Sequence, residues 1–109
     1  YKASGTITNG NTLTIVSSAN DDNILGTVWQ VTVYFHYGTS NPNLQVYWCY
    51  ATTASSLNVF KIVDDLDSDT TGPPSLAWTS GAGIVWTNTD ASDATVKASA
   101  LRIQSGNDF

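Results

Sequence analysis

The sequence has few charged residues, and its cations are scattered along the chain. Charged residues make up 12% of the sequence, about half the usual share, and the net charge is −5. The four cations are Lys2, Lys61, Lys97 and Arg102. Nucleic-acid binding requires clustered Lys and Arg that neutralise phosphates. We therefore expect no nucleic-acid partner.

Long apolar runs and strong helix formers are also missing. No run approaches the ~18 apolar residues needed to span a bilayer, so we expect a soluble chain without membrane insertion. Glu and Met are absent, Val, Ile, Thr, Tyr and Trp abound, and Thr, Ser and Asn together supply about a third of the residues. This composition favours strands over helices. The length of 109 residues predicts one domain, spanning 1–109.

Catalytic and zinc-binding residue types are scarce. A single cysteine and a single histidine exclude an internal disulfide and leave a tetrahedral zinc site dependent on aspartates from distant loops. Cys49 lies in an alternating aromatic run, where we expect a buried thiol. His36 lies mid-strand among polar residues, which is typical of a surface or interface histidine. No G-x-S-x-G motif is present, and the aspartates occur in polar loops, so we expect no catalytic residues and no enzyme activity.

Period-two alternation of apolar and polar residues gives the clearest strand signal. In 27–37, Trp29 and the alternate apolar residues after it share one face, and mostly polar residues occupy the other. A turn cluster follows, and 44–51 then alternates with Trp48 among its apolar positions. We expect these two strands to pair antiparallel, with Trp29 and Trp48 in the core.

Shorter runs extend the strand pattern toward both ends. Asn9-Gly10 predicts a β-hairpin over 2–16, and the glycine-rich turn 80–83 predicts a connection between two short strands. The strand 94–104 changes its apolar face, which predicts a bulge near Ala100 or burial on both faces.

The segment 57–63 has apolar residues on both faces. Such a strand is either covered on both sides or meets another subunit. Seven or eight short strands in all, with no helical pattern, predict an all-β chain folded as an antiparallel, jelly-roll-like β-sandwich.

The run "DDLDSD" raises the question of a metal site. Asp65, Asp67 and Asp69 have the i, i+2, i+4 spacing that begins an EF-hand loop. Thr70 stands where that loop needs Gly, and Leu76 stands where it needs Glu. Two interpretations remain open, a solvated acidic turn and a Ca²⁺ site of another kind with these three aspartates as ligands.

Aromatic residues are the second candidate for function. Four Trp and five Tyr are a heavy load for one small core, because tryptophan is rarely fully buried. Such rings stack on sugars or pack against a neighbouring subunit. The candidate ligand-binding residues are Trp78, Trp86, Tyr34, Tyr47 and Tyr50.

The last quarter of the chain, "GIVWTNTDASDATVKASALRIQSG", contains a strand at 84–86, a polar turn at 88–93 and a final strand at 95–103. This segment resembles the closing β-hairpin of C-terminal receptor-binding domains in phage tail fibres and similar virion appendages. The resemblance implies a homotrimer at the virion surface that attaches to a host-surface glycan or protein.

Two functional hypotheses follow, and both place the chain outside the cell or on a virion. The preferred one is a non-enzymatic phage or viral appendage domain for host attachment through loops and exposed aromatic residues. The alternative is a secreted carbohydrate-binding module or lectin, which acts as a monomer. Oligomeric state distinguishes them. A small hydrolase is a third, weaker alternative.

Overall fold

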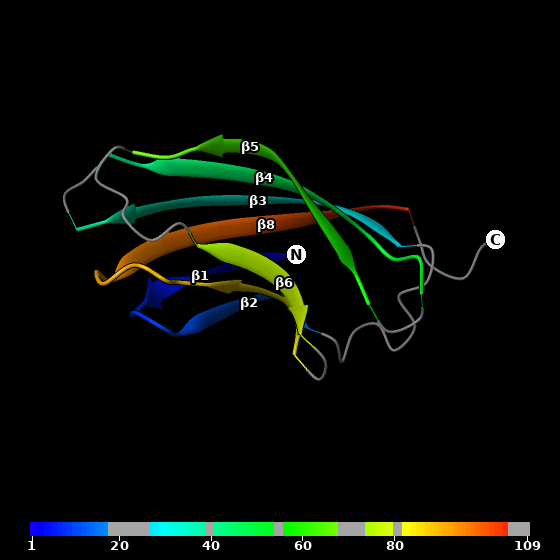
Figure 1. Ribbon diagram of the computed structural model, residues 1–109, viewed down its shortest axis with the longest axis horizontal. Helices are drawn as coiled ribbons and strands as arrows, with labels where there is room; N and C mark the ends of the chain where they lie inside the picture. Colours follow the sequence, from blue (N-terminus) through cyan, green and yellow to red (C-terminus); the bar gives the residue numbers. More distant parts are fainter. Residues whose placement is uncertain (18–26, 39–40, 54–55, 68–73, 80–81, 105–109) are drawn as a thin grey trace.

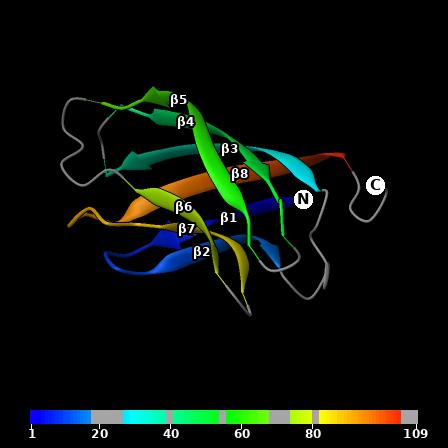
Figure 2. The same cartoon turned by 45° about the vertical axis from the view of Figure 1, so that its right-hand side comes forward.

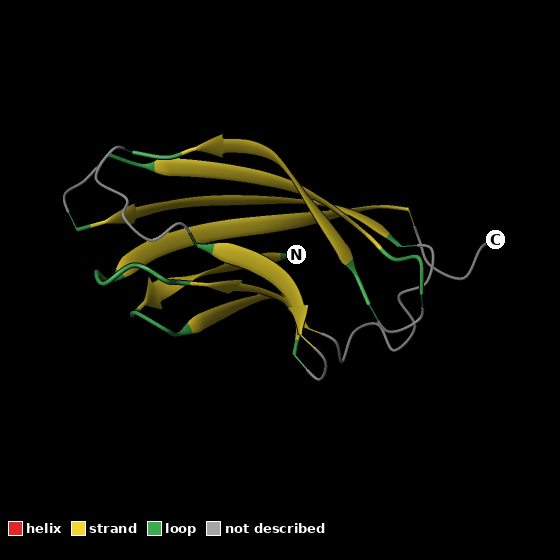
Figure 3. Ribbon diagram, viewed as in Figure 1, coloured by secondary structure: helices red, strands yellow, loops and turns green. Residues whose placement is uncertain are grey.

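Eight strands form the molecule, shown in Figures 1 and 3. The computed structural model describes residues 1–17, 27–38, 41–53, 56–67, 74–79 and 82–104. Among these residues there is no helix, and hence none long and apolar enough to cross a membrane. The strands are β1 (Lys2–Ile7), β2 (Thr12–Ser17), β3 (Val28–Tyr37), β4 (Asn43–Tyr50), β5 (Asn58–Asp65), β6 (Ser75–Thr79), β7 (Gly83–Thr87) and β8 (Ala94–Gln104).

The strands divide into two antiparallel sheets. A five-stranded sheet has the order β1-β8-β3-β4-β5, and a three-stranded sheet has the order β2-β7-β6. Figure 2 shows the smaller sheet at the β1 and β8 side of the larger one. The first two strands lie beside the last two, with β1 next to β8 and β2 next to β7, whereas β3, β4 and β5 form a meander. The predicted all-β sandwich is confirmed.

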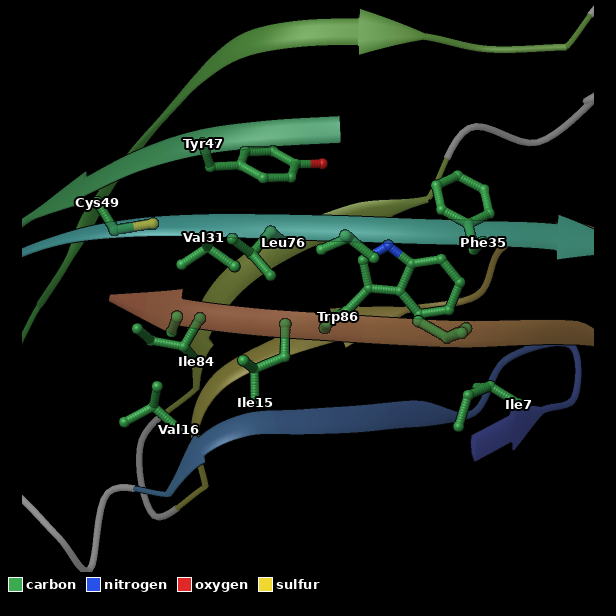
Figure 4. Close-up of a cluster of buried hydrophobic side chains, with 14 of the residues drawn as sticks. Ile7, Ile15, Val16, Val31, Phe35, Tyr47, Cys49, Leu76, Ile84 and Trp86 are labelled. Carbon is green, nitrogen blue, oxygen red and sulfur yellow. The ribbon is translucent and has the colours of Figure 1, made fainter. Parts of the chain in front are cut away.

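The β3 strand is the centre of the core. Trp29, Val31, Val33 and Phe35 alternate along it and are almost fully buried, as the period-two pattern predicts. Trp86 of β7 packs against Phe35, with ring centroids 5.2 Å apart, so the two sheets interdigitate around these rings (Figure 4). The prediction that Trp29 is a core residue is confirmed.

The β4 strand presents the opposite face from the one expected. It pairs antiparallel with β3 as predicted, and Cys49 lies directly opposite Trp29. Residues directly opposite each other share a face, so Cys49 and its alternate neighbours point into the core, and Cys49 is buried as expected. Trp48 therefore points outward and is 37% exposed. The prediction that Trp48 is a core residue is wrong.

Two predicted hairpins are also wrong, because the chain crosses between sheets at both turns. The Asn9-Gly10 turn forms, with Gly10 at φ 79° and Asn11 N donating to Thr8 O at 3.0 Å. However, β1 pairs with β8 and β2 pairs with β7. The strands flanking 88–93 likewise lie in different sheets. The glycine-rich turn, by contrast, joins paired strands, since β6 and β7 are antiparallel neighbours.

Each of the two strands with apolar residues on both faces contains a bulge, but Leu101 and Phe60 precede it and are exposed on the outward face. In β8, Arg102 pairs with Trp29 and Gln104 with Val28, so residue 103 is the extra one and the bulge lies three residues beyond the predicted position. In β5, residue 62 is the extra one between two paired positions. A bulge shifts the following residues to the other face of the sheet.

Candidate binding face

The outer face is the side of the five-stranded sheet turned away from the three-stranded sheet, and it carries large exposed apolar side chains. Alternate residues of each strand point to this side, because side chains alternate between the two faces of a sheet. Contiguous apolar patches of this kind mark binding surfaces. Its exposed large apolar residues are Tyr34, Trp48, Tyr50, Phe60 and Leu101.

Strand register arranges one row of these side chains across the sheet. Gln30 of β3 lies opposite Leu101 of β8 on one side and opposite Trp48 of β4 on the other. Trp48 in turn lies opposite Phe60 of β5. Directly opposite residues have Cβ atoms about 5 Å apart. The row therefore presents an aliphatic group, an amide and two aromatic rings in succession.

The neighbouring row is more polar. Ser99 of β8 lies opposite Lys2 of β1 and opposite Thr32 of β3, and Thr32 lies opposite Val46 of β4. This row has an ammonium group, two hydroxyl groups and one aliphatic side chain. The two rows are adjacent, because Thr32 is two residues from Gln30 on the same face of β3.

A shallow hollow of about 350 Å³ opens where the two rows meet. We call it the outer-face hollow. Ser99 and Thr32 lie directly opposite each other and have the shortest outward side chains among its lining residues. A second hollow of about 320 Å³ shares Lys2 with it and extends to Lys97. The outer-face hollow is lined by Tyr1, Lys2, Gln30, Thr32, Ser99, Ala100 and Leu101.

The five aromatic residues proposed as ligand-binding from the sequence do not gather at one place. Tyr34 and Tyr50 are exposed on the outer face. Trp78 lies on β6 in the other sheet and packs partly buried against the core. Trp86 is 0% exposed and Tyr47 is 2% exposed, so the expectation that these two rings are available to a ligand is wrong.

Tyr47 points inward because it belongs to a buried polar chain. Its hydroxyl donates to Gln45 Oε1 at 2.8 Å, and Gln45 Nε2 donates to Asp64 Oδ1 at 3.0 Å. Lys61 Nζ lies 3.3 Å from Asp64 Oδ2. Burial, and then the charge of Asp64, raise the pKa of Tyr47 well above its usual value. Inward polar residues are tolerated here because each finds a hydrogen-bond partner.

The acidic run contributes to structure in two ways that the sequence does not reveal. Asp64 points inward to Gln45, whereas Asp65 is exposed opposite Leu44 on the outer face. The backbone N of Asp67 donates to Asn43 Oδ1 at 2.6 Å. Asp69, the third proposed Ca²⁺ ligand, lies outside the described residues.

Within the described ranges, no three His, Cys, Asp or Glu side chains converge as a metal site would require. Because Asp69 belongs to the expected ligand set, the Ca²⁺ site at Asp65, Asp67 and Asp69 stays a prediction.

The two residues with the most reactive side chains are held in structural positions. His36 Nδ1 lies 3.0 Å from Gly38 O in the turn that follows its strand. Burial raises the pKa of the Cys49 thiol to about 12, so the thiol is protonated at neutral pH. A protonated, buried thiol is a poor nucleophile.

Sequence reasoning missed most of the outer-face hollow. Gln30, Thr32 and Ser99 are ordinary polar residues on strands, and only the register of β1, β8 and β3 brings them together with Lys2. The one sequence signal that could have indicated these residues is the polar face of β3, on the opposite side of the strand from its apolar face. The chain matches no protein-family model, and neither a curated protein nor a solved structure is significantly similar to it.

Proposed function

We propose that this protein is a non-catalytic binding domain whose outer face holds a glycan chain. The observation that carries the proposal is the outer-face hollow, which combines hydroxyl groups and an amide in its lining with the exposed ring of Trp48 beside Gln30. A sugar offers hydroxyl groups around its ring and apolar C–H groups on its faces. Binding sites for such ligands pair an apolar surface with a few placed polar groups.

The size and shape of the hollow favour a glycan over a protein surface. A protein partner is best held by a large patch with anchors in fully desolvated pockets. The hollow instead is small, open and shallow, and its lining combines apolar groups with two hydroxyl groups, from Ser99 and Thr32, and the amide of Gln30. Its groups suit a ligand that needs many weak polar contacts.

Host attachment by a phage or viral appendage is the biological setting that we propose for this binding. It rests on the low charge and the hydroxyl-rich composition and on the sequence resemblance described above, although the two strands of that segment lie in different sheets and form no hairpin. A homotrimer belongs to the same proposal. Its contact would cover Phe60, which is 64% exposed, and Ile62, which is exposed at the β5 bulge. Because the bulge and the neighbouring Lys61 and Asp64 disfavour edge-to-edge strand pairing, we expect side-chain packing there rather than sheet extension.

The alternative, a monomeric carbohydrate-binding module or lectin, would use the same outer-face hollow. The two hypotheses share the glycan and differ in oligomeric state. Light scattering distinguishes them, since a particle of three chains supports the appendage and a particle of one chain of 11.6 kDa supports the module.

The test of glycan binding is a panel of bacterial and animal surface glycans, probed with the wild-type protein and with Trp48→Ala. We expect the wild type to bind a related subset, and the variant to bind it about tenfold more weakly, because one aromatic contact is removed. Phe60→Ala is the matched control on the same row, one strand farther from the hollow. Absence of binding by the wild type, or equal loss in both variants, would contradict the proposal.

A further inference from the structure

We propose that the glycan carries a carboxylate group, which Lys2 and Lys97 bind together at the edge of the outer-face hollow. This inference rests on the glycan-binding function proposed above. It adds the chemical class of the ligand, an acidic sugar, and two residues that select it.

The two lysines are neighbours on one face. Lys2 lies opposite Ser99, and Lys97 precedes Ser99 by two residues on the same side of β8. Such diagonal neighbours are about 7–8 Å apart between their Cα atoms. Lys2 lines both hollows, and Lys97 lines the second. Two flexible side chains at this spacing can direct their ammonium groups at one anion.

The pair has no counter-charge in the described part of the chain. The residues opposite them are neutral: Ser99 lies opposite Lys2, and Ser4 and Tyr34 lie opposite Lys97. Asp65 lies in the same row as Lys97 but three strands away on β5, which is about 14 Å at the usual strand spacing.

Two adjacent ammonium groups repel each other, and a bound anion removes this repulsion. The arrangement is notable in a chain with a net charge of −5. This local positive charge favours an anionic occupant.

The surrounding groups favour a carboxylate over a phosphate. Phosphate sites usually add backbone N–H groups or an arginine fork to the charge of a lysine. Here β8 is hydrogen-bonded on both sides, to β1 and to β3, so the sheet already uses its backbone donors. Arg102 points inward, with its guanidinium 4.5 Å from the Trp29 ring centroid. Two ammonium groups and the Ser99 hydroxyl remain, and these suit a carboxylate, whose two oxygens can each accept from one ammonium group.

The experiment compares the double variant Lys2→Gln/Lys97→Gln with the wild type on a panel of carboxylated, sulfated and neutral glycans. The wild type should bind carboxylated glycans, and the double variant should bind them about 25-fold more weakly, at about fivefold for each exposed charge contact. Methyl esterification of a bound uronate should weaken wild-type binding similarly. Lys61→Gln is the control. It removes the charge of one lysine that lies on the inward side of β5, away from the hollow, and it should leave the affinity for the glycan unchanged.

The remaining outcomes separate failure of the acidic-sugar inference from failure of glycan binding. If the wild type binds only neutral glycans, or if the double variant binds the carboxylated ones as well as the wild type does, the acidic-sugar inference fails while glycan binding stands. Preference for sulfated glycans also overturns the choice of carboxylate. If no glycan binds, the proposed function itself fails. Circular dichroism of each variant shows whether the sheet structure is retained, which we expect because both lysines are exposed.

Discussion

Replacement of Asn88 should destabilise the fold strongly, because one small side chain makes four hydrogen bonds. It lies fully buried at the start of the crossing from β7 to β8. Its Nδ2 donates to Ile7 O at 2.8 Å and to Ser92 O at 2.9 Å. Its Oδ1 accepts from Asp90 N at 2.9 Å and from Tyr37 OH at 3.4 Å. One amide therefore links β1, β3 and the crossing segment.

Asn88→Ala removes these four hydrogen bonds. The backbone and hydroxyl groups that bonded to the Asn88 amide then lose that hydrogen-bond partner. At about 1 kcal/mol for each bond, the free energy of unfolding should fall by about 3–5 kcal/mol. Urea unfolding followed by tryptophan fluorescence measures this change. Asn58→Ala is the control, since its side chain makes one exposed hydrogen bond to Thr52 at 3.3 Å, and it should cost less than about 1 kcal/mol. An equal effect of the two substitutions would refute the role given to Asn88.

Three further predictions concern buried side chains. Burial and the nearby Asp90 raise the pKa of Tyr37 to about 12, above its unfolded value near 10, so its contribution to stability should be constant below about pH 10 and decline as the pH rises toward 12. Ultraviolet titration should show Tyr37 and Tyr47 ionising above pH 10, the usual value for tyrosine; ionisation of either residue at that usual value would contradict its burial. Cys49 should not react with a thiol reagent at pH 8 until the protein is unfolded, and rapid reaction of the native protein would place the thiol at the surface. Tyr47→Phe should lower the free energy of unfolding by about 1–3 kcal/mol, measured in urea, because the buried Gln45 Oε1 loses its donor; no change would show that water replaces it.

The sequence was sufficient to predict what depends on local alternation. The strand β3 follows the period-two pattern over its whole length, and Trp29 and Phe35 are buried where the pattern places them. The same reasoning failed for β4, where Gln45 points inward and Trp48 outward. The inward amide is satisfied by Asp64, from the next strand, and a partner nineteen residues away leaves no local signal.

Long-range pairing explains the remaining differences. Asn9-Gly10 forms the expected turn, but β1 then pairs with a strand from the other end of the chain. The hollow on the outer face depends on the same pairing, since Lys2 and Ser99 meet only when β1 joins β8. Trp86 was expected to be an exposed ring, yet both faces of β7 are covered, and its indole packs against Phe35.

Amide chemical-shift mapping with a glycan selected from the panel locates the binding site. We expect the shifted amides to cluster at Gln30, Thr32 and Ser99, with smaller shifts along the strands of Lys2 and Trp48. Shifts confined to the three-stranded sheet, or spread over the β5 edge at Phe60 without any change at Ser99, would contradict binding at the outer-face hollow.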